Sequence, residues 1–457
     1  MPTQKSSPSS SSPKLKRENV PSGRSFRGLT SRISSGKFSK REALTAAAGL
    51  VVIAAVVIVF VSAAGLRKRI NLSFQGTAGN VIRNSDGSLA FNSTTPGTPN
   101  TATGKFYIVG KQIVDPDGNV FRPMGANVAL RQAPYLENNY IFNYFGTAND
   151  KSEQVKAWGW NTIRPNINCA STSNPSTTET LAGLDQLVNE YTAKKMVVMV
   201  TCRVVVGEDH PYTNGEIQAS LPMIKTIAQK YKNNPYVWMN PFNEPTANQS
   251  GWIDLNTKLY NDVRAAAPDM IYSPDLAGLG NQIETLVDGN LAADFGAGKC
   301  NILYDWHAYG FINGNYATEA QLQQYMIRLS EKKIAMIVGE FGDPLLQNGE
   351  PFMVRVDPKT DGIAGSPTQN RIAANAVLKS AAQLGYGMTW WIATGDQNNK
   401  ITYSLTKDMT SPWTVTQANA ATKLAPAGKL FWDVSHQSHN LGKFTGNIRD
   451  SGCASAR

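Results

Sequence analysis

Residues 237–245 read VWMNPFNEP, an apolar run that stops abruptly at an Asn-Glu-Pro tripeptide. A short apolar run bounded by turn residues is typical of a buried strand. Because the residue before a proline is disfavoured in the helical region, we expect Glu244 to lie extended at the end of this strand. A carboxyl group held at a strand end suits acid–base chemistry, provided that a second carboxylate lies opposite it.

On both sides of this stretch, short apolar runs alternate with segments of helical periodicity. Besides Val237–Asn243, seven runs predict strands: Pro123–Val128, Trp160–Pro165, Met196–Arg203, Met270–Ser273, Ile302–His307, Ala335–Glu340 and Met388–Ala393. Amphipathic segments between them predict helices: Glu216–Tyr231, Trp252–Ala266, Thr318–Lys332 and Asn370–Leu384. Eight strands with interleaved helices predict an α/β chain folded as a (β/α)8 TIM barrel. An open doubly wound sheet is the alternative, but no Gly-rich phosphate-binding fingerprint follows the first strand.

Composition divides the 457-residue chain into distinct parts. Residues 1–42 hold ten Lys or Arg, two acids and twelve serines, with almost no large apolar side chain, which predicts a disordered basic cytosolic tail. Residues 67–104 are rich in Asn, Ser, Thr and Gly and predict a flexible stalk, whereas residues 105–457 predict the barrel domain. The tail accounts for +8 of the net charge of +10, so we expect no nucleic acid as a partner of the folded part.

Residues 43–66 are 24 consecutive uncharged residues, dominated by Ala, Val, Ile and Leu. This length predicts one transmembrane helix, an uncleaved signal anchor, with the lipid bilayer as its partner. A cleaved signal peptide and a buried core helix are the alternatives. The larger basic charge lies on the N-terminal side, so we expect a single-pass type II membrane protein whose folded domain is extracellular or lumenal. Glycosylation sequons at Asn71, Asn92 and Asn248 fit that location in a eukaryotic host.

The four cysteines are too few for a disulfide framework and lack the spacing of metal ligands. Isolated buried thiols are one interpretation. The other is a bridge formed in an oxidising compartment, for which Cys169 and Cys202 are the first candidates because both lie near the ends of consecutive predicted strands.

Side chains suited to chemistry close several of the predicted strands. In a barrel of this kind the C-terminal ends of the strands meet on one face, so residues far apart in sequence can share a site. The residues at these ends are Arg164 on the second strand, Asn243 and Glu244 on the fourth, His307 and Tyr309 on the sixth, Glu340 on the seventh, and Trp390 and Trp391 on the eighth. No single residue among them is specific, but their conjunction is.

At these positions the chain resembles the retaining glycoside hydrolases with a (β/α)8 fold, and most closely glycoside hydrolase family 5, the cellulase and mannanase family. The resemblance covers about residues 105–440 and includes VGKQIVDPDGNV (109–120) leading to GANV (125–128) before the first strand ends. It implies that Glu244 is the general acid/base and that Glu340 is the nucleophile.

The resemblance also implies supporting roles. Asn243 would contact the sugar 2-hydroxyl, Arg164 would lie beside the nucleophile, and His307 and Tyr309 would hold the two carboxylates in their ionisation states. Trp391 would be the sugar-stacking platform, with Trp390 as its ambiguous neighbour. From the residues alone, Arg164 could instead be a structural ion pair and Trp390 packed core, since adjacent strand residues face opposite sides.

One departure from the family concerns the end of the third strand, where many members have a histidine. This chain reads VTCR at residues 200–203, with His210 seven residues further on. We expect Cys202, Arg203 or His210 to fill that place. The EDH run at residues 208–210 does not match metal-ligand spacing, so a solvated loop is the favoured interpretation there.

The predicted function is hydrolysis of a β-1,4-linked glucan by double displacement, without cofactor or metal. Glycosidic bond cleavage needs one protonated carboxyl to donate to the leaving oxygen and one ionised carboxylate to attack the anomeric carbon. β-Mannan and other β-glycans remain alternative substrates because loops set specificity. A barrel that binds polysaccharide without cutting it is the alternative from another functional class.

Overall fold

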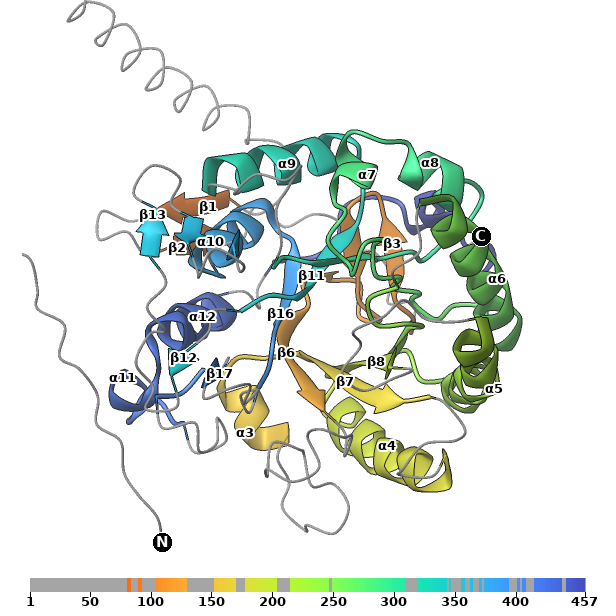
Figure 1. Cartoon of the computed structure of the whole chain (residues 1–457), viewed down its shortest axis with the longest axis horizontal. Coiled ribbons are helices and arrows are strands. Elements are labelled where there is room, and N and C mark those ends of the chain that lie inside the picture. Colours follow the sequence, from red (N-terminus) through yellow and green to blue (C-terminus); the bar gives the residue numbers. More distant parts are fainter. Residues whose placement is uncertain are drawn as a thin grey trace, which may run out of the picture. The chain divides into compact units, whose positions relative to one another are not determined.

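A curved sheet of seven parallel strands forms the centre of the computed structural model, in the order β10-β11-β16-β6-β7-β8-β9 (Figure 1). The strands are β6 (Met124–Ala129), β7 (Thr162–Asn168), β8 (Val197–Arg203), β9 (Val237–Asn240), β10 (Tyr304–His307), β11 (Met336–Glu340) and β16 (Gly387–Trp390). The structure describes residues 104–129, 152–169, 177–203, 214–245, 249–309, 319–342, 374–393, 405–407, 415–437 and 441–456, together with short strands elsewhere.

The ring is closed by a segment that is too short to count as a regular strand. The backbone N–H of Met239 donates to the carbonyl of Ile271 at 2.9 Å, and the N–H of Tyr272 donates to the carbonyl of Asn301 at 2.9 Å. Tyr272 thereby bridges β9 to the residues that precede β10. The predicted strand at Met270–Ser273 is thus reduced to isolated bridges, and the arrangement matches the predicted (β/α)8 barrel.

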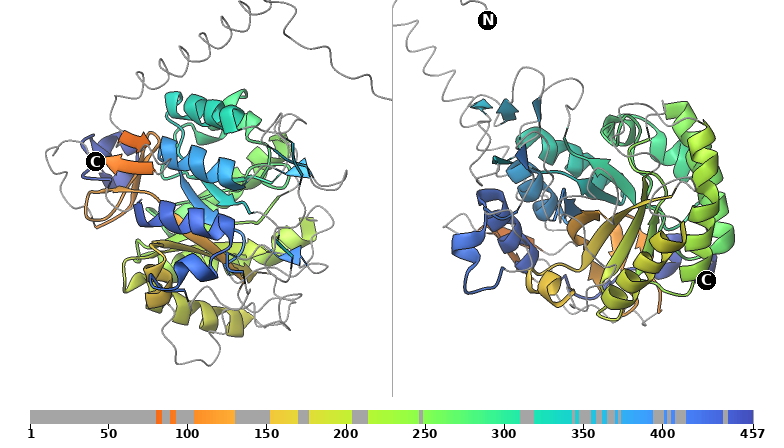
Figure 2. Two further views of the ribbon diagram at one scale, coloured as in Figure 1. Left: turned by 90° about the vertical axis from the view of Figure 1, so that its left-hand side faces the viewer. Right: turned by 60° about the horizontal axis from the view of Figure 1, so that its bottom comes forward.

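Helices surround the strands on the outside of the ring (Figures 1 and 2). Those longer than six residues are α4 (Thr177–Thr192), α5 (Asn214–Tyr231), α6 (Gln249–Ala266), α9 (Glu319–Glu331), α10 (Ala374–Leu384) and α12 (Pro426–Gln437). Shorter ones are α3 (Ser152–Ala157), α7 (Glu284–Val287), α8 (Leu291–Gly296) and α11 (Ala420–Lys423). The helix predicted at Asn370–Leu384 begins only at Ala374, because Asn370 and Arg371 form the short strand β15 (Asn370–Arg371).

The strands are buried on both faces, which explains their nearly continuous apolar sequences. All seven residues of β8 are buried, for example. The largest core cluster lies between strands and helices, where Trp160 and Trp390 pack near Phe431 of α12. Burial of such apolar surface is the main favourable contribution to folding.

A small antiparallel sheet belongs to the amino-terminal end of the barrel. It comprises β3 (Tyr107–Val109), β4 (Gln112–Val114) and β5 (Val120–Phe121). Phe106, just before β3, packs edge-on against Trp238 with ring centroids 5.1 Å apart. The two rings belong to a second apolar cluster with Ile271, Leu303 and Ile337, residues that come from the strands or their starts. This cluster fills the barrel interior at that end.

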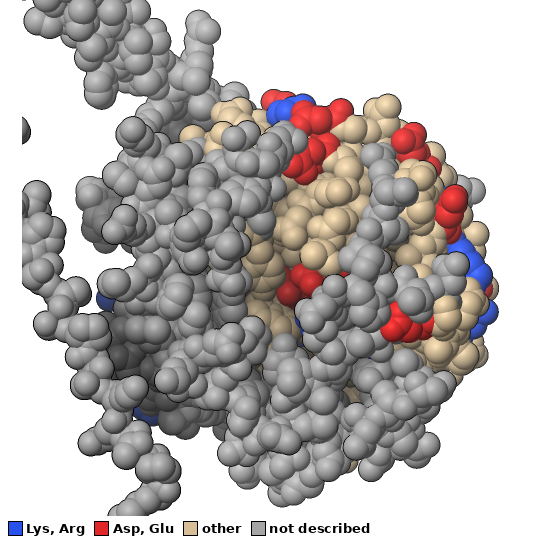
Figure 3. Space-filling view, viewed as in Figure 1, with Lys and Arg blue, Asp and Glu red and all other residues tan. Residues whose placement is uncertain are grey.

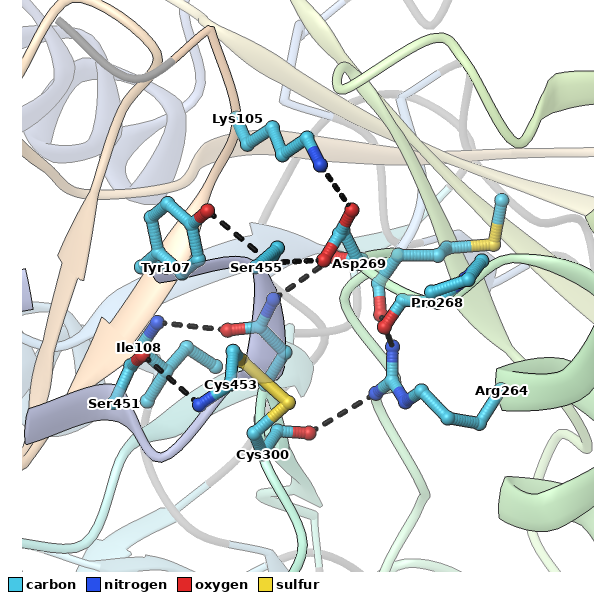
Figure 4. The surroundings of a disulfide bond; sticks show 12 residues. Lys105, Tyr107, Ile108, Arg264, Pro268, Asp269, Cys300, Ser451, Cys453 and Ser455 are labelled. Carbon is cyan, nitrogen blue, oxygen red and sulfur yellow. Dashed lines mark hydrogen bonds and ion pairs between the residues drawn. A yellow bond between two sulfur atoms is a disulfide. The ribbon is translucent and has the colours of Figure 1, made fainter. Parts of the chain in front are cut away.

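The carboxyl terminus is fastened to the same end by a disulfide between Cys300 and Cys453 (Figure 4). Ser455 donates a hydrogen bond to Asp269, which also pairs with Lys105, and Tyr107 donates to Ser455 at 3.2 Å. The contacts join residues from both ends of the folded domain to the loop before Tyr272. We call these residues, together with the Cys300–Cys453 bridge, the C-terminal clasp.

A second disulfide joins Cys169, after β7, to Cys202 in β8, with their Cα atoms 5.3 Å apart. The predicted Cys169–Cys202 pairing is therefore present. The alternative of isolated buried thiols is wrong, since no cysteine is free. Nothing in the sequence pattern pointed to the Cys300–Cys453 bridge, whose partners are 153 residues apart.

The predicted basic tail and signal anchor, residues 1–42 and 43–66, lie outside the described residues. In the part of the chain that the structure describes, no helix combines the length and the apolar character that crossing a bilayer requires. Within the predicted stalk, two short strands pair with each other, β1 (Asn80–Arg83) and β2 (Leu89–Asn92). The boundaries of tail, anchor, stalk and domain remain predictions.

Candidate active site

Arg164 in β7 is the centre of a buried group of polar residues at the carboxyl ends of the strands. Its guanidinium is fully buried and donates to Glu340 Oε1 at 2.6 Å and to Asn127 Oδ1 at 2.7 Å. It also donates to both oxygens of Asp275 at 3.2 Å, and its Nε lies 3.4 Å from Asp305 Oδ2. The predicted place of Arg164, beside Glu340, is therefore observed.

Two buried aspartates face this arginine, and sequence reasoning singled out neither of them. Asp275 follows the bridging segment at Tyr272, and Asp305 is the second residue of β10. Asn240, at the end of β9, donates to both carboxylates through its Nδ2 atom. The signals that could have found them are the SPDLAGLG run (273–280) after the fifth strand and the YDWH motif (304–307) of the sixth.

His307 connects this buried group to both glutamates. Its Nδ1 atom lies 2.8 Å from Glu244 Oε1 and 3.6 Å from Glu340 Oε2, and its Nε2 atom lies 3.1 Å from Asp275 Oδ2. Gly280 packs so closely that a Cβ atom on it would lie 2.6 Å from the His307 ring, and it already has a φ of +75°. A glycine is therefore required beside this imidazole.

The backbone at Glu244 differs from the sequence prediction. We expected an extended conformation before Pro245, but Glu244 has a φ of +51°, in the left-handed region. Its N–H donates to Asp275 Oδ2 at 2.8 Å, a hydrogen bond to a charged acceptor that compensates for the unfavourable conformation. The prediction was wrong because the proline rule considers only neighbours in sequence, whereas a carboxylate 31 residues away holds this turn.

Glu340, the last residue of β11, lies across from Glu244. A carboxylate oxygen of Glu244, a ring nitrogen of His307 and a carboxylate oxygen of Glu340 all lie within 4.8 Å of one another. The preceding residue is Gly339, where a Cβ atom would lie 1.7 Å from Asp305 Oδ1, so only glycine allows Asp305 to approach. The Tyr309 hydroxyl donates to Glu340 Oε2 at 3.4 Å.

The two glutamates differ in exposure. The Glu244 side chain is 22% exposed and that of Glu340 is 3% exposed. Figure 3 shows Asp and Glu atoms near the middle of one face, next to a surface of uncharged atoms. Glu244 is thus the carboxylate that water or a ligand reaches more easily.

Arg203, the last residue of β8, is one of the three candidates for the place of the histidine that many family members have. Its Nη2 atom lies 3.7 Å from Glu340 Oε1, and its Nε donates to Asn166 Oδ1 at 3.0 Å. The guanidinium lies over the Trp391 ring, 4.8 Å from the ring centre, a cation–π arrangement. Cys202 is engaged in the disulfide, and His210 lies outside the described residues together with the rest of the EDH run.

The tryptophan pair is divided between two environments. Trp390 is fully buried and packs edge-on against Phe341, with ring centroids 5.3 Å apart, in the core between sheet and helices. Of the two tryptophans considered as a sugar-stacking platform, Trp390 is therefore excluded, because strand alternation turns its side chain away from the barrel mouth. Trp391 packs with Tyr309 and Arg203 on the side of the glutamates. Its stacking role stays a prediction.

Asn243 lies beside Arg164, which donates to its Oδ1 atom at 3.3 Å. Its N–H donates to the carbonyl of Cys202 at 2.8 Å, so the residue is held at the end of the neighbouring strand β8. The structure thus brings together the predicted residues Glu244, Glu340, Arg164, Asn243, His307, Tyr309 and Trp391, and separates Trp390 from them.

The charges of the buried group compensate one another. Burial alone would lower the pKa of His307, but Asp275 and Glu340 outweigh it and raise that pKa well above its ordinary value. Burial alone would raise the pKa of Asp275, but His307 and Arg164 outweigh it and lower that pKa. Burial and the Asp275 charge raise the pKa of Asp305 to about 7. Near neutral pH two cations therefore face Asp275 and Glu340, while Asp305 is partly protonated.

Among the described residues, two sets of side chains have the ligand types of a metal site: Glu244, His307 and Glu340, and Asp275, Asp305 and His307. Arg164 is within ion-pair distance of three of these carboxylates, so a fixed cation already lies among them. The donor set therefore suits proton transfer better than binding of a divalent ion. The expected lack of metal and cofactor stays a prediction.

The profile of the family Cellulase (glycosyl hydrolase family 5) matches residues 114–397 of this chain. A mannan endo-1,4-beta-mannosidase of Cellvibrio japonicus (strain Ueda107) is 20% identical over 303 residues, which are 65% of this chain and 61% of that protein. The chain thus spans less than two thirds of the length of this relative.

Solved structures show the same fold. The catalytic domain of a Thermobifida fusca endoglucanase in complex with cellotetraose is 17% identical, with a TM-score of 0.52. The match covers 75% of this chain and 100% of the endoglucanase domain. A beta-mannanase from Streptomyces thermolilacinus with mannohexaose is 15% identical, with a TM-score of 0.51, and covers 76% and 98%. The barrel with its two facing glutamates and the match over more than half of the residues lead to one conclusion: the chain belongs to glycosyl hydrolase family 5.

Proposed function

We propose that this chain is a retaining glycoside hydrolase that cleaves a β-1,4-linked glucan by double displacement, with Glu244 as acid/base and Glu340 as nucleophile. The observation that carries the proposal is the spacing of the two carboxylates, whose nearest oxygens lie within 4.8 Å. Retaining enzymes place these groups about 5–5.5 Å apart, and inverting ones about 6.5–9.5 Å apart to leave room for a water molecule. The observed spacing supports retention.

The contacts of Glu340 suit a nucleophile. Arg164 and Arg203 both lie on the side of its Oε1 atom, at 2.6 and 3.7 Å. Its Oε2 atom, with Tyr309 at 3.4 Å, is then the one to attack the anomeric carbon. The two arginines orient the carboxylate through Oε1, while Oε2 lies 3.4 Å from the Tyr309 hydroxyl and 3.6 Å from His307 Nδ1, longer contacts than that of Arg164. Such fixed donors are what pre-organised catalysis requires.

In the first step Glu340 Oε2 forms a bond to the anomeric carbon while Glu244 donates its proton to the departing glycosidic oxygen. In the second step Glu244 takes a proton from water, and the resulting hydroxide displaces Glu340 from the sugar. The greater exposure of Glu244, 22% against 3%, fits its need to meet both the leaving group and water.

β-Mannan is the second candidate substrate. The curated relatives from Cellvibrio japonicus and from Streptomyces lividans are both described as mannan endo-1,4-beta-mannosidases, at 20% and 21% identity. A glucan and a mannan differ in the orientation of the 2-hydroxyl, the group that Asn243 is expected to contact. Their discrimination is therefore a matter of side chains around the site rather than of the two glutamates.

The test is an assay of the purified full chain in detergent on carboxymethylcellulose, galactomannan and xyloglucan. We expect Glu244→Gln and Glu340→Gln each to lower kcat by roughly 10³-fold or more, because each removes a group used in the transition state. Glu331→Gln, an exposed glutamate at the end of α9, is the matched control and should leave kcat unchanged. Equal rates in wild type and in all three variants would contradict the assignment of Glu244 and Glu340 as catalytic residues. Binding of a polysaccharide without turnover by wild type would favour a non-catalytic polysaccharide-binding barrel.

Product stereochemistry tests the mechanism separately. Proton NMR of freshly released sugar should show the same anomeric configuration as the substrate. An inverted product would contradict double displacement even if both glutamates proved essential.

We also propose that residues 43–66 anchor the enzyme as a single-pass type II membrane protein, with the barrel extracellular or lumenal. The support is the sequence itself, 24 uncharged residues between two basic segments. Protease added to intact cells should digest the barrel and spare an epitope tag at the N-terminus. Digestion of the tag with protection of the barrel would show the opposite topology. Release of the protein from membranes by alkaline carbonate would contradict the proposed anchor.

A further inference from the structure

Asp275 is a buried carboxylate that contacts four residues of the candidate site: Arg164, Asn240, Glu244 and His307. Its side chain is fully buried, and it follows the segment that closes the barrel. The indole N–H of Trp252 donates to its backbone carbonyl at 2.7 Å, so α6 fixes its position from outside. Neither the acid/base nor the nucleophile role assigned above uses this residue.

One carboxylate oxygen of Asp275 contacts both Glu244 and His307. Asp275 Oδ2 accepts the backbone N–H of Glu244 at 2.8 Å and lies 3.1 Å from His307 Nε2. The other oxygen accepts from Asn240, and Arg164 donates to both. The carboxylate therefore has a partner on every side and little freedom to rotate.

The histidine continues this chain of contacts to the carboxyl group of Glu244. With Nε2 against Asp275 and Nδ1 at 2.8 Å from Glu244 Oε1, the ring has a carboxylate at each nitrogen. Only the doubly protonated imidazole can donate to both. Asp275 thus acts on Glu244 in two ways: directly on the backbone N–H of Glu244, and through His307 on the Glu244 carboxylate.

We infer that Asp275 is a positioning residue for Glu244: it holds the backbone of Glu244 in the left-handed turn and holds His307 as a donor to the Glu244 carboxylate. The inference rests on the proposed function. When Glu244 gives its proton to the glycosidic oxygen, the new carboxylate accepts the Nδ1–H of His307. When Glu244 later takes a proton from water, His307 keeps both of its own protons. Asp275 and His307 therefore position Glu244 without transferring a proton themselves.

The neighbouring Asp305 provides the matched comparison. It shares Arg164 and Asn240 with Asp275, but its nearest contact with His307 Nε2 is 3.8 Å, and no hydrogen bond joins it to Glu244 in the described residues. The charged or titratable groups around Asp275 are Arg164, Glu244, Asp305, His307 and Glu340. An isosteric change of Asp275 or of Asp305 to asparagine removes one carboxylate charge in each case. The comparison therefore distinguishes the direct contacts of Asp275 with Glu244 and His307 from the effect of a nearby negative charge.

The experiment compares Asp275→Asn with Asp305→Asn in the full chain. The chain has four histidines, so ¹⁵N-histidine NMR can follow the His307 ring, assigned by loss of its signals in His307→Gln. We expect Asp275→Asn to lower the titration midpoint of His307 by about 1–3 pH units, as loss of a contacting opposite charge does. Asp305→Asn should lower it less.

Activity gives the second readout. Asp275→Asn should lower kcat by about 10²-fold, the lower end of what general acid–base catalysis contributes, with KM changed only a few-fold. The basic limb of its pH–rate profile should move, and that of Asp305→Asn should move less. Equal effects of the two variants on midpoint and kcat, or no effect of Asp275→Asn, would overturn the inference.

Two further measurements cover the case in which Asp275→Asn does not fold. In the wild-type chain His307 should stay doubly protonated well above pH 6.5, and an ordinary midpoint near that value would refute the inference. Trp252→Phe loosens Asp275 without removing its charge and should give a smaller shift in the same direction. If wild type cleaves no polysaccharide, the proposed function fails, while the histidine titrations still report on the Asp275 contact.

Discussion

Two arginines, one just before β6 and one in β7, are buried at opposite ends of the barrel and are compensated in opposite ways. Arg122, just before β6, is 2% exposed and donates to the carbonyl of Ala382 at 3.0 Å. Burial lowers the pKa of Arg122 to about 10. For Arg164 burial acts in the same direction, but Asp275, Asp305 and Glu340 outweigh it and raise the pKa. One guanidinium is held by the backbone and the other by acids.

The comparison extends to everything around the two residues. At the amino-terminal end Phe106 and Trp238 fill the interior, and the C-terminal clasp fastens the chain there. At the carboxyl-terminal end the interior holds charges. Buried ion groups are costly to desolvate and seldom add net stability, so this end is built for chemistry and the other supports it. Three measurements test that division.

The largest expected effect is that of Arg164→Met. Removal of this cation leaves Asp275 and Glu340 without their main partner, and breaking a buried pair in this way costs about 3–5 kcal/mol. We expect the free energy of unfolding in urea to fall by that amount and kcat to be lost. Arg122→Met is the matched control and should cost less, about 1–3 kcal/mol for a carbonyl left unsatisfied, with kcat retained in the folded protein. A larger loss from Arg122→Met would contradict the division.

An intermediate effect is expected from the two disulfides. The double change Cys300→Ser and Cys453→Ser opens the clasp and should lower the free energy of unfolding by about 2–4 kcal/mol. Its kcat should be unchanged, because the bridge packs beside Tyr107 of β3 (Figure 4), in the sheet at the amino-terminal end of the barrel. The double change Cys169→Ser and Cys202→Ser should lower kcat as well, since Arg203 follows Cys202 and lies 3.7 Å from Glu340. Equal kcat in both pairs would show that the second bridge has no part in the site.

The smallest effect concerns pH. The pKa of Asp305 rises from its ordinary value of 3.8 to about 7, so between these values the folded chain holds a proton that the unfolded chain has lost. Its contribution to the free energy of unfolding therefore falls as the pH rises through this window. Asp305→Asn should reduce the difference in unfolding free energy between pH 4.5 and pH 7.5. Asp254→Asn, an exposed control on α6, should not, and the same slope in both variants would place the titration elsewhere.

Much of the architecture follows from local pattern. Seven of the eight predicted strands are present within a few residues, because apolar runs bounded by turn residues depend only on neighbouring positions. The remaining predicted strand, Met270–Ser273, is reduced to isolated bridges, because its pairing depends on Met239 and Ile302 on either side. A sequence pattern marks where a strand can form, but pairing decides how long it becomes.

The same distinction divides the site. The sequence alone was enough to place His307 and Glu340 at strand ends, Arg164 on a strand and Glu244 just after one, and in a barrel such positions share one face. The folded chain was needed to show that Asp275 holds Glu244 in a left-handed turn, that Trp390 faces the core and that Arg203 lies beside Glu340. These outcomes depend on contacts between segments distant in the chain, whose geometry is set by closing the ring, and no local pattern of residues encodes that closure.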